Sequence, residues 1–78
     1  MLRRTEKLLI TFYTTAAAMN MEHICKEVKA EGRLIPVPGF ISADCGLGWC
    51  AGLEREADLK GLMEQHNITA QGIHHCLI

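Results

Sequence analysis

The residues of this chain best suited to covalent chemistry are its four cysteines, at positions 25, 45, 50 and 76. Cys45 differs from the others in its surroundings, because two prolines lie before it in PVPGFISADC and a glycine follows it directly at position 46. Glycine and proline are the residues that most strongly shape a turn. Gly46 would also allow another backbone or a substrate to come close. The sequence therefore indicates a loop that is shaped around the Cys45 sulfur.

Three consecutive residues near the end of the sequence, His74, His75 and Cys76, have the side chains of zinc ligands. Neighbouring residues of a strand point to opposite faces, however. The chain also has no C-x-x-C or H-x-x-x-H pair of the kind that zinc sites use. We therefore predict no metal site, and nothing else in the sequence calls for a cofactor.

The elements that would position Cys45 begin with a strand over residues 7–13, KLLITFY, which is rich in β-branched and aromatic residues. Thr14 or Thr15 can then cap a helix that ends near Gly32. The helix is expected to bury a stripe at helical spacing. Its members are Ala17, Ala18, Met21, Ile24, Cys25 and Val28.

The second half of the chain predicts two more strands and a helix. Residues 33–37 read as a strand at a sheet edge, because Pro36 cannot donate to a ladder. Residues 47–52 alternate in size, which places Trp49 toward the core and Cys50 on the opposite face. The helix is expected at 54–66 with Asn67 as its cap, and the last strand at 71–76.

This order, βαββαβ, predicts an α+β domain of the ferredoxin-like kind. Such a domain has a four-stranded antiparallel sheet in the order 4-1-3-2 with both helices on one face. The strand that carries Pro36 is then an edge strand, as its proline requires. We expect residues 1–78 to form one domain with a thin core, since a chain of this length buries only about 60% of its unfolded surface.

In that topology Cys45 lies close to Thr14 and Thr15, at the N-terminus of the first helix. The free N–H groups and positive dipole end of a helix stabilise a nearby anion, and so favour a thiolate. Ser42 could offer a hydroxyl to the sulfur, whereas the carboxylate of Asp44 would oppose a thiolate unless it points into solvent. The simpler alternative is that Cys45 is a small buried residue at the base of a hairpin.

The composition of the chain argues against binding to nucleic acid or membranes and favours a cytoplasmic protein. The chain is 49% hydrophobic and 22% charged with a formal net charge of -1, so no electrostatic attraction to nucleic acid or an anionic membrane is expected. The apolar run 8–12 is too short for a signal peptide or a membrane span. We therefore expect a cytoplasmic protein whose cysteines stay thiols.

Three stretches together, LITFYTTAAAM, RLIPVPGFISADCGLG and QGIHH, resemble the small family of proteins described as selenium/sulfur carrier-like. The most specific part is the strand LIPVP followed by Ser42, Cys45 and Gly46, which matches the family's P-x-P and S-x-x-C-G pattern. The resemblance covers nearly the whole chain. Gly39 stands where family members usually have a basic residue.

The resemblance implies that Cys45 carries sulfur or selenium as a persulfide or selenopersulfide, with Gly46 shaping the loop. It also implies a role in selenium or sulfur metabolism, with a cysteine or selenocysteine desulfurase as donor and an acceptor protein as partner. The alternative from the residues is a non-catalytic binding or assembly module with a structural Cys45. In that module the sheet face without helices would pack on another protein or a second copy, since Leu9 and Tyr13 give it apolar residues.

Overall fold

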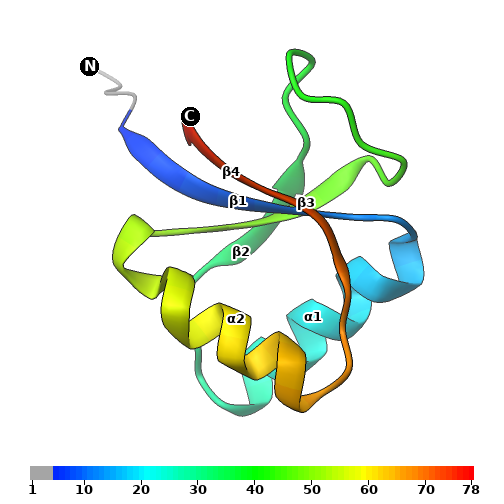
Figure 1. The fold of residues 1–78 in the computed structure, drawn as a ribbon, viewed down its shortest axis with the longest axis vertical. Coiled ribbons are helices and arrows are strands. Elements are labelled where there is room, and N and C mark those ends of the chain that lie inside the picture. The colour runs from blue at the N-terminus through cyan, green and yellow to red at the C-terminus, as the bar shows by residue number, and fades with distance from the viewer. Residues whose placement is uncertain (1–4) are drawn as a thin grey trace.

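A four-stranded antiparallel sheet with two helices forms the fold of this chain. The structure is a computed structural model and describes residues 5–78. Its elements in chain order are β1 (Glu6–Phe12), α1 (Thr15–Glu27), β2 (Arg33–Pro36), β3 (Leu47–Ala51), the 3₁₀ turn η1 (Leu53–Arg55), α2 (Glu56–Gln65) and β4 (Ala70–Leu77). The strand order is β2-β3-β1-β4, which is the predicted order read from the other edge. Both helices lie on the same side of the sheet (Figure 1).

The core lies between the sheet and the two helices. From β1 it takes the alternate residues Leu8, Ile10 and Phe12, all fully buried. From β3 it takes Trp49 and Ala51, as the alternation of residue size predicted. The register confirms this face, because Ile10 lies opposite Trp49 and Leu8 opposite Ala51.

The edge position predicted for β2 is confirmed. β2 pairs with β3 on one side, with Leu34 opposite Trp49 and Pro36 opposite Leu47. A proline at the end of an edge strand costs no ladder hydrogen bond. The pairing continues for one further bond, in which the Val37 N–H donates to the Gly46 carbonyl at 2.9 Å.

The first helix is shorter than the sequence predicted. Thr14 caps its start, since the Thr14 Oγ1 accepts from the Ala17 N–H at 3.1 Å. The helix ends at Glu27, and Lys29 then turns the backbone into the left-handed region at φ 57°. Val28 is consequently 53% exposed, so its assignment to the buried stripe was wrong.

The second helix starts with a 3₁₀ turn where an α-helix was expected. Residues Leu53–Arg55 form that turn, and regular α-helix runs from Glu56 to Gln65. Asn67 follows at φ 56°, which confirms it as the left-handed residue that ends the helix. Leu59 and Met63 are the residues that this helix buries.

The sheet face away from the helices is partly covered by the chain itself. Leu9 lies on that face but is 0% exposed. It packs where Gly48 has no side chain, since a Cβ there would lie 2.9 Å from the Leu9 Cδ1 and 3.4 Å from a Val37 methyl. The connection between β2 and β3 rises on this side of the sheet (Figure 1). Leu9 therefore does not leave the apolar surface that the sequence suggested.

Candidate functional site around Cys45

Cys45 lies at the rim of the sheet where β1 ends, α1 begins and β3 is about to start. Its N–H donates to the Phe12 carbonyl at 3.2 Å, which ties the loop to the end of β1. Its Sγ lies 3.7 Å from the Thr15 Oγ1, in the first turn of α1. The structure thus brings together the cysteine and the helix N-terminus that the topology placed side by side.

The sulfur has a second polar neighbour in its own loop. The Leu47 N–H donates to the Cys45 Sγ at 3.4 Å. In the thiol form the S–H points to the Thr15 hydroxyl, whereas in the thiolate form that hydroxyl can reverse and donate. A negative sulfur here would therefore accept two hydrogen bonds without any movement of the backbone.

Access to this sulfur is restricted. Cys45 is 3% exposed and packs with the core residues between sheet and helices. Phe40, by contrast, is 70% exposed, so its ring does not close over the rim. A reagent can reach the Cys45 sulfur only when the loop opens locally.

The remaining predicted site residues take different positions around Cys45. Thr14 acts on the helix as its cap. Ser42 is exposed, and within residues 5–78 no hydrogen bond joins its hydroxyl to the Cys45 sulfur. Gly46 is exposed, and a Cβ built on it would have open space around it. Of the predicted site residues, the structure therefore places Thr15 at the sulfur, but not Ser42.

Asp44, the residue that could oppose a thiolate, is exposed. Its N–H donates to the Gln71 Oε1 at 2.8 Å, a bond that ties the loop to β4. Exposure to water screens the charge of a carboxylate. Gln71 could not be predicted as a partner of this loop, because the bond joins two segments 27 residues apart in the chain.

The other three thiols lie in two environments, and all four cysteines are free. Cys25 is fully buried on α1 as predicted, and burial raises its pKa to about 11. Cys50 and Cys76 are half-buried, and Cys50 takes the face opposite Trp49 as predicted. The four cysteines therefore divide into two core thiols and two thiols on the open face.

The two neighbouring histidines of β4 point to opposite faces of the sheet. His75 lies on the helix side, where its Nε2 is 2.7 Å from the Glu56 Oε1. His74 lies opposite Leu9 on the other face. Among residues 5–78 no three His, Cys, Asp or Glu side chains gather in a way that could hold a metal ion.

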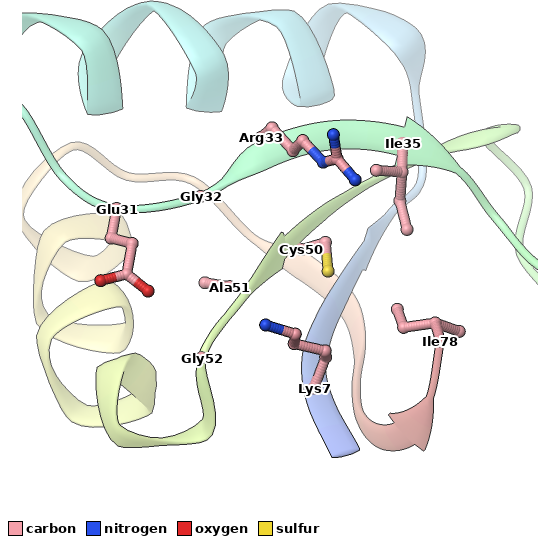
Figure 2. Close-up of a pocket in the computed structure, with 9 residues that line it drawn as sticks. All are labelled: Lys7, Glu31, Gly32, Arg33, Ile35, Cys50, Ala51, Gly52 and Ile78. Atoms are coloured by element: carbon pink, nitrogen blue, oxygen red, sulfur yellow. The ribbon is translucent and has the colours of Figure 1, made fainter. Parts of the chain in front are cut away.

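A cluster that the sequence reasoning missed surrounds Cys50. Arg33 lies directly opposite Cys50 in the β2–β3 ladder, and Lys7 comes from the same face of β1. These residues line a cavity of about 380 Å³ together with Ile35 and Ile78 (Figure 2). The period-2 pattern of three paired strands could have revealed this cluster.

The sequence of this chain matches a known protein family over most of its length. A family model described as "Putative Se/S carrier protein-like" matches residues 7–75. The chain belongs to this family. The family match includes Cys25, Cys45 and Cys50 and stops before Cys76. No curated protein and no solved structure matches the chain.

Within the part of the chain that the structure describes, no helix is both long and apolar enough to cross a bilayer.

Proposed function

We propose that this member of the Se/S carrier-like family carries a sulfur or selenium atom on Cys45 and passes it to a partner protein. The observation that supports this most is the position of the Cys45 sulfur, 3.7 Å from the hydroxyl of Thr15 at the start of α1 and 3.4 Å from the N–H of Leu47 at the start of β3. A carrier sulfur must be held as an anion when it reacts, and these groups suit an anion.

Loading would follow thiol–disulfide exchange chemistry. The Cys45 thiolate attacks the outer sulfur of a persulfide on the donor, the donor's S–S bond breaks, and a new S–S bond forms on Cys45. The donor leaves as a thiolate and takes up the proton that Cys45 released. Delivery is the same exchange with the acceptor's thiolate as attacker, and selenium would follow the same course as a selenopersulfide.

Each of the other site residues has a proposed part in this transfer. Thr15 would donate to the anionic sulfur, and Thr14 would keep the first turn of α1 in place. Ser42 and Gly46 are exposed beside Cys45 and would meet the partner protein rather than the cargo. The missing side chain at Gly46 and the open space beside it would let an acceptor cysteine approach closely.

The proposed partners are a cysteine or selenocysteine desulfurase as donor and a thiol protein as acceptor. The four free cysteines suit a reducing compartment such as the cytoplasm. The βαββαβ order with its antiparallel sheet supports assigning the chain to the ferredoxin-like class as one domain.

The test of the carrier is intact-protein mass spectrometry after incubation with a cysteine desulfurase and cysteine, or a selenocysteine lyase and selenocysteine. We expect a mass gain of one chalcogen atom in the wild type, in Cys50→Ser and in Cys76→Ser. The gain should be absent in Cys45→Ser. A gain that persists in Cys45→Ser, or moves with Cys50, would refute the assignment.

A second candidate function is a non-catalytic binding or assembly module in which Cys45 only packs. The observation in its favour is the 3% exposure of Cys45. The two candidates differ in Cys45→Ala, because a packing residue is needed for stability and a carrier residue for loading. Cys45→Ala that unfolds at lower urea, together with a wild type that never loads, would leave Cys45 with a packing role and favour the assembly module over the carrier.

A further inference from the structure

The cavity around Cys50 lies outside the proposed Cys45 site, on the sheet face away from the helices. Its walls combine a thiol, two basic side chains and two apolar side chains in a volume of about 380 Å³. That volume lies within the range of small-molecule sites. Figure 2 shows the Cys50 sulfur between Arg33 of β2 and Lys7 of β1.

The charges of this cavity are unbalanced. Among residues 5–78, neither Lys7 nor Arg33 takes part in an ion pair. The acidic residue at the cavity rim, Glu31, is already engaged, because its Oε2 lies 3.3 Å from the Arg55 Nε. An anion that enters the cavity would therefore meet two cations that no ion pair within residues 5–78 neutralises, and one carboxylate, Glu31, that is paired with Arg55.

The Cys50 thiol itself responds to these cations. Burial raises the pKa of Cys50 above its ordinary value, while the positive charges of Lys7 and Arg33 act to lower it. Most of the thiol is consequently protonated near neutral pH. Selective reaction at Cys50 thus requires a reagent that is concentrated in the cavity by its own charge.

Cys76 provides a comparison on the same face. It lies opposite Lys7 in the β1–β4 ladder and, like Cys50, is half-buried. Burial raises the pKa of Cys76, and the nearby Cys50 and Glu6 raise it further. The two thiols therefore share a sheet face and the neighbour Lys7, but Cys50 has Arg33 as a second charged neighbour, whereas Cys76 has Glu6.

We propose that the Cys50 cavity is a site for small anionic disulfides, which modify Cys50 reversibly as a mixed disulfide. The anionic groups of the disulfide bind Lys7 and Arg33, and the Cys50 thiolate attacks the nearer sulfur. The ligand's S–S bond breaks as the Cys50 S–S bond forms. Its second half leaves as a thiolate and takes the proton from Cys50, so the disulfide is the oxidant. This site is independent of the cargo proposed for Cys45.

The experiment uses three disulfides that differ in charge: oxidised glutathione (anionic), 2-hydroxyethyl disulfide (neutral) and cystamine (cationic). The full chain is kept dilute, and modification of each cysteine is followed by peptide mapping. We expect the ratio of Cys50 to Cys76 modification to be highest with glutathione and lowest with cystamine. Raising the salt concentration should bring the three ratios together.

Variants then identify the cations. Lys7→Gln and Arg33→Gln should each slow the glutathione reaction at Cys50 by about fivefold more than they slow the neutral disulfide, because both reactions lose thiolate and only glutathione also loses its attraction to the cation. Lys60→Gln, whose ammonium pairs with Glu56 on α2, is the matched control. Equal Cys50 to Cys76 ratios for all three disulfides in the wild type would overturn the proposal, whatever the variants do.

Discussion

Cys25 and Cys45 are both core thiols, but their sulfurs have different neighbours. The Cys45 sulfur contacts a hydroxyl and a backbone N–H, whereas the pKa of Cys25 is raised to about 11 by burial. Burial without a compensating partner disfavours the charged form of a side chain. The two cysteines are therefore similarly buried, but only the Cys45 sulfur has hydrogen-bonding neighbours beside it.

We predict that Cys25 is the least reactive thiol and Cys45 the most reactive one near neutral pH. The Cys45 sulfur lies beside the Thr15 hydroxyl and the Leu47 N–H in a surface loop, while Cys25 would have to ionise inside the core. Limiting iodoacetamide across a pH series, with peptide mapping, measures the order. Labelling in urea, where all four should react alike, is the control. Rapid labelling of Cys25 in the native protein would contradict the prediction.

At Glu56 we predict a stability contribution that depends on pH. Hydrogen bonds from Lys60 and His75 lower the pKa of Glu56. A carboxyl group with a lowered pKa stabilises the fold above its unfolded pKa of about 4.3, and this contribution is lost as the pH falls through the lower folded value.

Urea unfolding of the wild type and Glu56→Gln measures this effect. The wild type should be the more stable at about pH 6, and the difference should shrink below about pH 4. Glu64→Gln, an exposed carboxylate on the same helix, serves as control. A difference that stays constant with pH would show that the Glu56 charge does not contribute.

Among the elements, the connection from α1 to β2 is the one most constrained by a single residue. Gly32 has φ 131°, and a Cβ there would lie 2.5 Å from the Trp49 Nε1 and 2.7 Å from the Cys50 carbonyl oxygen. We predict that Gly32→Ala destabilises the protein by more than about 1 kcal/mol, because both the backbone and the indole must shift.

The matched control is Gly61→Ala in α2, where a Cβ has open space. Alanine in an exposed helix interior should stabilise by about 0.5–1 kcal/mol. Urea or thermal unfolding of both variants gives the comparison. Similar shifts in the same direction would mean that the Gly32 conformation is not the cause.

The strands could be predicted from the sequence because their signals are local. The alternation of residue size in β3 predicted that Trp49 faces the core, and the proline in β2 predicted that this strand lies at the sheet edge. The end of α1 was predicted too late, since Val28 fits the stripe but the chain turns at Lys29. The 3% exposure of Cys45 agrees with the alternative of a small buried residue, whereas the contact of its loop with Gln71 depends on how the loop folds onto a distant strand, and no local pattern records that.

For the whole molecule we retain the prediction that a second copy covers part of the open sheet face at high concentration. Leu9 is buried in its own chain, so the remaining contact residues would be those around the Cys50 cavity. Assembly and modification should therefore compete for one surface. Sedimentation velocity over a concentration series measures assembly, and Cys50 thiolation should slow as dimer forms. A strict monomer at high concentration would contradict the prediction.

The hydrogen bond from the Cys45 N–H to the Phe12 carbonyl holds the loop against β1. The rate at which the loop opens would therefore limit the rate of the proposed transfer. The sulfur belongs to a residue that is 3% exposed, and we expect the local opening that admits a donor to break this bond. The exchange of the Cys45 amide proton with deuterium reports the same opening events. Under conditions where every opening leads to exchange, that exchange rate is the ceiling on sulfur loading. A partner that loads Cys45 faster than this ceiling must pull the loop open itself.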